Sequence, residues 1–249
     1  MSDERFDDQE QQGDQRAEEP DGEARLAEPA AWSREVTVPS GAVSLAGTLT
    51  LPERARGLVL FAHGSGSSRF SPRNRFVAGE LHVARLGTLL IDLLTPEEEA
   101  IDRRTGALRF DVGLLAERLV GATGWLREQP ETRHLRIGYF GASTGAAAAL
   151  VAAAQLPSTV RAVVSRGGRP DLARDALRRV RAPTLLIVGE LDTPVIPLNE
   201  AALAALPGEK RLEIVPGATH LFEEPGALEA VARLARDWFV RYLPAGGVD

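Results

Sequence analysis

The residue best placed for covalent chemistry is Ser143, in the pentapeptide Gly-Ala-Ser-Thr-Gly at 141–145. An apolar run at Leu135–Phe140 predicts a strand directly before this pentapeptide, and an alanine-rich run from Ala146 predicts a helix directly after it. A serine on a tight strand-to-helix turn needs very small neighbours two positions away, so that the strand and the helix can approach each other. The helix amino terminus adds N–H groups and a dipole that stabilise developing negative charge. We therefore predict that Ser143 is a nucleophile rather than a bystander in a glycine-rich turn.

A serine hydroxyl is a weak nucleophile, so Ser143 requires a base, and histidine is the usual one. The chain has four histidines. His220 follows the last predicted strand, Arg211–Val215, at the carboxyl edge of a parallel sheet, where catalytic residues gather. His82 falls within a predicted helix and His134 precedes a strand at its amino end, so both are expected to be structural or solvent-facing. His220 is the predicted general base.

The carboxylate that orients this histidine is predicted to be Asp192, which follows the apolar strand Thr184–Val188. The resulting chain order of serine, aspartate and histidine is the order that α/β-hydrolases use. Asp171, after the preceding strand, is the alternative acid, and Glu190 is expected to point outward from its turn. The competing interpretation of Asp192 is a helix-capping residue.

The loop after the predicted strand Leu58–Ala62 reads His-Gly-Ser-Gly-Ser-Ser at 63–68. Small residues let backbone amides approach a substrate oxygen, so this loop is expected to supply one donor of an oxyanion hole. We assign that donor to the backbone N–H of Ser65 and the second to that of Thr144, directly after the nucleophile. His63 is expected to support the loop through hydrogen bonds. The loop lacks the glycine-lysine-serine ending of a P-loop, which argues against a phosphate cradle of that type.

Two arginines on neighbouring loops suggest the charge of the substrate. Arg69 continues the loop just described, and Arg166 follows the predicted strand Val160–Val164. Both loops leave the carboxyl ends of strands, so both are expected to border the crevice that holds the serine. Because a guanidinium suits carboxylate and phosphate groups, the pair favours an anionic ester. The alternative is that these arginines are surface charges, or partners of Asp92 and Asp171.

Strands and helices alternate along the chain after an opening hairpin at Val36–Val38 and Val43–Leu51. The strands named above and Thr88–Ile91 are continuous apolar runs, as a sheet covered on both faces requires. We therefore predict an α/β fold with a doubly wound, mostly parallel sheet of eight strands. The segment between Val164 and Thr184 leaves room for a crossover helix, and we expect no separate cap domain.

Composition limits what else the protein can do. The chain of 249 residues has no cysteine, which excludes disulfides, thiolate metal sites and a cysteine nucleophile. Residues 1–33 hold eleven acidic residues against three arginines, a net charge of −8; the whole chain carries −6, so residues 34–249 carry +2. A nearly neutral domain gives no reason to expect a nucleic acid or a membrane as partner. We expect no cofactor and no metal, a small-molecule ester substrate, and a monomer or small homo-oligomer.

The amino-terminal segment differs in character from the rest. Residues 1–33 contain almost no periodic apolar residues, so we predict a disordered acidic tail followed by a catalytic domain at 34–249. The segment also lacks the positive start and apolar stretch of a secretory signal, which favours a cytoplasmic location.

Over residues 35–244 the sequence resembles the dienelactone hydrolase-related branch of the α/β-hydrolases. The resemblance rests on four segments: FAHGSGSSRFSPRN, GYFGASTGAAAAL, LLIVGELDTPV and PGATHLFEEPG. It implies the same three catalytic residues, Ser143, Asp192 and His220. True dienelactone hydrolases use cysteine where this chain has Ser143, and such domains can also be joined to phosphoribosyltransferase domains.

These observations predict a serine hydrolase that cleaves a carboxylic ester, lactone or thioester through a seryl-acyl intermediate. Two alternatives stay open. Acyl transfer would use the same residues with an alcohol or amine in place of water, and a non-catalytic binding module would keep the fold without the reaction.

Overall fold

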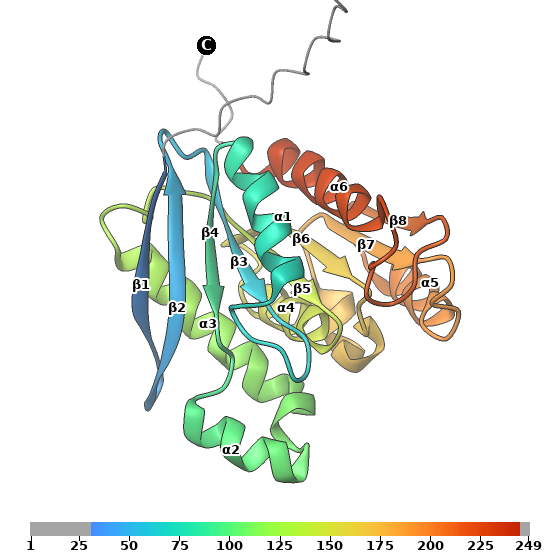
Figure 1. Ribbon diagram of the computed structural model, residues 1–249, viewed down its shortest axis with the longest axis horizontal. Coiled ribbons are helices and arrows are strands. Elements are labelled where there is room, and N and C mark those ends of the chain that lie inside the picture. The colour runs from blue at the N-terminus through green and yellow to red at the C-terminus, as the bar shows by residue number, and fades with distance from the viewer. Residues whose placement is uncertain (1–30, 245–249) are drawn as a thin grey trace, which may run out of the picture.

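The computed structural model of the chain describes residues 31–244 (Figure 1). Its centre is an eight-stranded sheet with the strand order β1-β2-β4-β3-β5-β6-β7-β8. The pairings of β1 with β2 and of β2 with β4 are antiparallel, and the remaining pairings are parallel. The strands are β1 (Ala31–Ser40), β2 (Val43–Pro52), β3 (Gly57–Ala62), β4 (Leu86–Ile91), β5 (Ile137–Ala142), β6 (Val160–Arg166), β7 (Thr184–Gly189) and β8 (Lys210–Val215).

Helices cover both faces of this sheet (Figure 1). One face carries α1 (Pro72–Val83) and α6 (Ala227–Tyr242), and the other carries α3 (Val112–Glu128), α4 (Thr144–Gln155) and α5 (Ile196–Ala205). Every residue of β3, β4, β5 and β7 is consequently buried. The predicted α/β fold with a doubly wound, mostly parallel sheet of eight strands is thus confirmed.

The parallel direction of β3 to β8 explains why distant segments of the chain meet. Their carboxyl ends share one edge of the sheet, so the loops that follow β3, β5, β6, β7 and β8 leave from the same side. Each residue that the sequence nominated for chemistry or substrate binding lies on one of these loops or at a strand end beside it.

The first strand begins earlier than the sequence suggested. β1 starts at Ala31 and pairs over its whole length with β2, from Ala31 opposite Pro52 to Ser40 opposite Val43. Residues 31–33 therefore belong to the sheet and not to the acidic tail, which was predicted to include them. Backbone hydrogen bonds to β2 hold these residues in a strand, and their side chains show no periodic pattern that would have predicted it. The rest of the predicted tail, residues 1–30, lies outside the described residues.

Between β4 and α3 the chain makes an excursion that the sequence analysis did not identify, through α2 (Pro96–Thr105) and the 3₁₀ turn η1 (Leu108–Phe110). The buried carboxylate of Asp102 holds it together by accepting hydrogen bonds from the backbone N–H groups of Leu108 and Arg109 and from Arg109 Nε.

The connection from β6 to β7 also differs from the simple crossover helix expected. It is a 3₁₀ stretch, η2 (Pro170–Arg179), interrupted by Arg174 at φ 48°. Within residues 31–244, no helix combines the length and the apolar character needed to cross a bilayer.

Candidate active site

Ser143 occupies a strained turn between β5 and α4. Its backbone has φ 51° and ψ −120°, a conformation that residues with a side chain rarely adopt. The flanking glycines make the turn possible: a Cβ on Gly141 would lie 2.4 Å from Ala146 Cα, and a Cβ on Gly145 would lie 2.4 Å from the carbonyl oxygens of Ala62 and His63. The pentapeptide therefore holds Ser143 at the start of α4, as the sequence predicted.

His220 and Asp192 meet on the same side of the sheet. His220 Nδ1 lies 2.6 Å from Asp192 Oδ2, and because a carboxylate oxygen accepts, Nδ1 carries the proton and Nε2 is left free to act as a base. Asp192 is only 8 % exposed, so its carboxylate is largely shielded from water, whereas the His220 side chain is 39 % exposed. Gly167, with φ 51°, passes beside the imidazole, where an added Cβ would come within 3.5 Å of His220 Cε1.

The other two acids considered from sequence are engaged elsewhere. Asp171 forms a two-pronged ion pair with Arg169, with N–O distances of 2.9 and 2.8 Å. Glu190 accepts a hydrogen bond of 2.8 Å from the backbone N–H of Gly217. Of these carboxylates, the structure therefore brings Asp192 to the histidine.

One cavity of about 210 Å³ joins the predicted nucleophile and base. Ser143, His220, Ser65 and Arg166 all line it. A larger hollow of about 580 Å³ includes His134, but it lies beside the amino-terminal end of the sheet, next to β1, and contains no serine. The smaller cavity is therefore the candidate active site. Among residues 31–244, no cluster of His, Asp and Glu side chains is arranged to hold a metal ion.

The two loops assigned to the oxyanion hole are joined by their side chains. Ser65 Oγ and Thr144 Oγ1 are 2.9 Å apart, a hydrogen-bond distance. Gly64 passes close to the turn that carries Ser143, since a Cβ on Gly64 would lie 3.1 Å from Ser143 Cβ. Ser65 and Thr144 therefore lie next to each other beside Ser143, and the assignment of their backbone N–H groups to an oxyanion hole stays a prediction.

His63 braces this loop against β4. Its Nδ1–H donates to the carbonyl of Gly64 at 2.9 Å, and its Nε2 accepts the backbone N–H of Leu93 at 3.1 Å. Burial lowers the pKa of His63, although the Gly64 carbonyl and the charges of Asp92 and Glu99 oppose the shift. The ring is therefore neutral in the folded protein, and protonation would place a donor against the Leu93 N–H.

This histidine predicts a pH-dependent stability. Because its pKa is lower in the folded than in the unfolded chain, its contribution is fully present above the unfolded pKa of about 6.5 and is lost as the pH falls toward the folded pKa. The melting temperature of the wild type should therefore fall more steeply below pH 6.5 than that of His63→Asn. Calorimetry on both proteins from pH 8 to pH 5 measures this difference, and parallel curves would contradict it.

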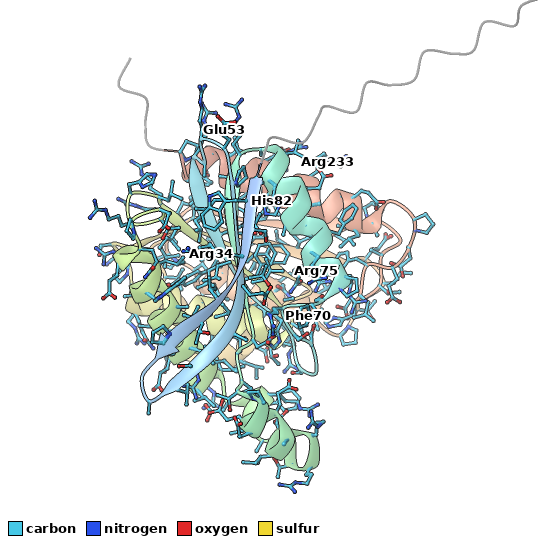
Figure 2. All side chains as sticks on the ribbon, turned by 60° about the vertical axis from the view of Figure 1, so that its left-hand side comes forward. Arg34, Glu53, Phe70, Arg75, His82 and Arg233 are labelled. Carbon is cyan, nitrogen blue, oxygen red and sulfur yellow. The ribbon has the colours of Figure 1, made fainter. Side chains whose placement is uncertain are left out.

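Arg69 does not reach the candidate active site, which corrects the expectation that it borders the crevice. Its guanidinium forms ion pairs with Asp92 and, at 3.3 Å, with Glu35, and it stacks on Phe70. Arg69 lines a separate hollow between α1 and the strands β1, β2 and β4, together with Arg75, which is labelled in Figure 2. The local acids decide its position, as the alternative involving Asp92 anticipated.

Arg73 takes the place that the sequence gave to Arg69. It lines the cavity together with Asn74, at the start of α1. Sequence reasoning missed both residues because the run of arginines after residue 68 does not reveal which of them face the crevice. The usable signal was the Ser-Pro pair at 71–72, which marks a helix start and so fixes the direction of the next side chains.

Comparison with solved structures defines the class. Est1E from Butyrivibrio proteoclasticus is 14 % identical with a TM-score of 0.70, and the alignment covers 83 % of this chain and 98 % of that one. A dienelactone hydrolase-like promiscuous phosphotriesterase, P91, from metagenomic libraries is 17 % identical with the same TM-score, covering 86 % and 99 %. At such identities the likeness shows the fold alone, which is that of the α/β-hydrolases.

The family follows from closer matches. The model of the dienelactone hydrolase family matches residues 88–243. The crystal structure of a dienelactone hydrolase from Anabaena variabilis is 66 % identical with a TM-score of 0.84, and the alignment covers 86 % of this chain and 99 % of that one. The chain belongs to the dienelactone hydrolase family, and this membership makes it a hydrolase.

A curated relative from Mycobacterium tuberculosis bears a different name, "Putative phosphoribosyl transferase". It is 61 % identical over 221 residues, which make up 89 % of this chain and 49 % of the relative. The chain therefore spans about half the length of this relative.

Proposed function

We propose that the protein hydrolyses a carboxylic ester, lactone or thioester through a covalent intermediate on Ser143. Ser143 Oγ attacks the carbonyl carbon while its proton passes to His220 Nε2, and the backbone N–H groups of Ser65 and Thr144 stabilise the oxyanion. Collapse of this intermediate transfers the proton to the leaving alcohol or thiol and leaves an acyl group on the serine. His220 then takes a proton from water, whose oxygen attacks the acyl carbon and releases the acid and free Ser143.

The observation that carries this proposal is the hydrogen bond between His220 and a shielded Asp192, beside a cavity that also contains Ser143. The carboxylate fixes the tautomer in which Nε2 is a base and stabilises the imidazolium that forms during the reaction. The strained backbone of Ser143 supports the same role, because strain of this kind persists where the surrounding structure holds a side chain in place for a task.

A fluorophosphonate probe tests the nucleophile directly, because it phosphonylates only activated serines. We expect one adduct per chain, on the peptide that contains Ser143, and none in Ser143→Ala. Ser158→Ala is the matched control, since Ser158 is an exposed serine that does not line the cavity, and it should label like the wild type. Mass spectrometry of intact and digested protein provides the measurement. No adduct on the wild type would favour a binding module that keeps only the fold.

A further inference from the structure

Arg166 is a buried cation that lies 5.9 Å from the centre of the Phe222 ring but lacks hydrogen-bond partners for part of its guanidinium. It is 7 % exposed, and neither its Nε nor its Nη1 has a hydrogen-bond partner. It ends β6 opposite Ala142 of β5, and its carbonyl accepts the backbone N–H of Ser143 at 3.2 Å. Burying an unpaired charge is costly, so such a residue is retained where a ligand supplies the missing partner.

A second cation shares this cavity. Arg73 also has a buried Nε without a partner, while its Nη1 is bonded at 2.8 Å to Glu223, a largely exposed acid. None of the eleven residues that line the cavity is acidic. Burial, with a smaller effect from the charge of Arg73, lowers the pKa of Arg166 to about 10, so Arg166 is still charged at neutral pH.

The surrounding groups also suit an anion. The cavity includes Ser71, which caps α1 through a hydrogen bond from the Asn74 N–H, so the positive end of this helix faces the same space. Ser67, which carries a hydroxyl group, lines the cavity as well. Two guanidinium groups, a helix terminus and hydroxyl donors therefore converge beside Ser143.

We propose that Arg166 and Arg73 bind the phosphate group of a phosphorylated ester, at a position in the cavity separate from the scissile bond. Two arginines that line the same cavity favour phosphate over carboxylate, because a phosphate monoester carries close to two negative charges at pH 7 and a carboxylate only one. This proposal names the substrate class of the proposed ester hydrolysis. The cleavage of the bound molecule rests on that proposed function, whereas the binding of its phosphate group does not.

Binding can be measured without catalysis. Phenyl phosphate titrated into Ser143→Ala in a calorimeter should bind, and benzoate should bind at least about tenfold more weakly, because it carries less negative charge and fewer acceptor oxygens. Adding Arg166→Met or Arg73→Gln should weaken the binding of phenyl phosphate by roughly ten- to a hundredfold. Arg75→Gln is the matched control: Arg75 lies two residues from Arg73 on the same helix but is exposed, outside the cavity and stacked on Phe70 (Figure 2).

Equal affinity for phenyl phosphate with and without Arg166→Met would overturn the site. Tighter binding of benzoate than of phenyl phosphate would overturn the choice of phosphate. The melting temperature of the unliganded protein separates a ligand-binding arginine from a structural one: Arg166→Met should melt at or above the temperature of the wild type, because the variant no longer buries an unpaired charge. If Arg166→Met melts well below the wild type, the guanidinium supports the fold rather than a ligand. Arg166→Lys is a second variant for the same comparison: it keeps the positive charge but lacks the planar pair of N–H donors of a guanidinium.

Kinetics on wild-type protein separate this inference from the proposed function. Three aryl acetates carrying a phosphate, a carboxylate or a neutral amide para to the ester serve as matched substrates. We expect kcat/KM for the phosphate compound to exceed that for the amide by roughly ten- to a hundredfold, and this ratio to approach one in Arg166→Met. Hydrolysis that depends on Ser143 but ignores substrate charge would overturn the phosphate site alone. Binding of phenyl phosphate that depends on Arg166, without any ester hydrolysis, would overturn the reaction alone.

Discussion

Replacing Ser143 or His220 by alanine is expected to lower the turnover of ester substrates on the order of 10⁴-fold or more. In the proposed reaction, attack and proton transfer occur in one step, so removing either partner removes the covalent pathway. Combining the two changes should add little, because the residues act as a unit. Steady-state rates of both single variants and the double variant on one aryl ester measure the effect.

Asp192→Asn belongs to the same experiment, with a somewhat smaller expected loss. An asparagine can fill the space of the carboxylate, but it neither holds His220 in the required tautomer as firmly nor stabilises the imidazolium. Asp171→Asn is the matched control, because Asp171 pairs with Arg169 instead of the histidine. A Ser143→Ala enzyme that kept a tenth of the wild-type rate would contradict the assignment, and so would an inactive Asp171→Asn beside an active Asp192→Asn.

The second large effect is expected from Gly145→Ala. The added Cβ would lie 2.4 Å from two backbone carbonyl oxygens, Ala62 O and His63 O, and backbone atoms cannot move aside as a flexible side chain can. The substitution must push α4 away from the end of β3. This shift would separate the turn at residues 141–145 from the loop at residues 63–68. We expect a loss of about 3 kcal/mol or more in the free energy of unfolding and a nearly inactive protein. Chemical denaturation followed by circular dichroism gives the first quantity.

Gly124→Ala is the control for this change. Gly124 lies within α3, is exposed, and has no atom within 4 Å of an added Cβ. The same chemical substitution should there stabilise the protein by about 0.5–1 kcal/mol, because alanine favours a helix more than glycine does. If both variants lost stability equally, the close contact of Gly145 with the backbone of residues 62 and 63 would not explain the loss.

Much of the site was predictable because its residues lie at the ends of predicted parallel strands. The runs that became β5 and β7 are fully buried, whereas β8 is a largely exposed edge strand with charged residues, and parallel pairing brings the carboxyl ends of all three together. Ser143, Asp192 and His220 could therefore be nominated from position alone. The choice of Asp192 over Asp171 was less secure from sequence, since both follow strands, and it is a local ion pair with Arg169 that occupies Asp171.

The features that escaped prediction depend on contacts across the sequence. The excursion through α2 and η1 is organised by the carboxylate of Asp102, which satisfies backbone groups that no periodic pattern reveals. The exchange of Arg69 for Arg73 has the same origin, because Asp92 and Glu35 hold Arg69 on the outside. A charged side chain that has several possible ion-pair partners takes an orientation that depends on the tertiary structure, and the sequence alone does not reveal it.

The shared sheet edge also has a consequence for how the protein folds. Ser65, Ser143, Asp192 and His220 lie on four different loops, which follow β3, β5, β7 and β8. All four come together only when β3 has paired with β5, β7 has paired with β8, and β6 has joined the two pairs. Pairings between segments so far apart in sequence form slowly, because long loops must close first. Hydrolytic activity is therefore expected to be a probe for the last stage of folding. In a refolding experiment it should return after the helical circular dichroism signal, and a truncation that lacks β8 should retain helices while showing no activity.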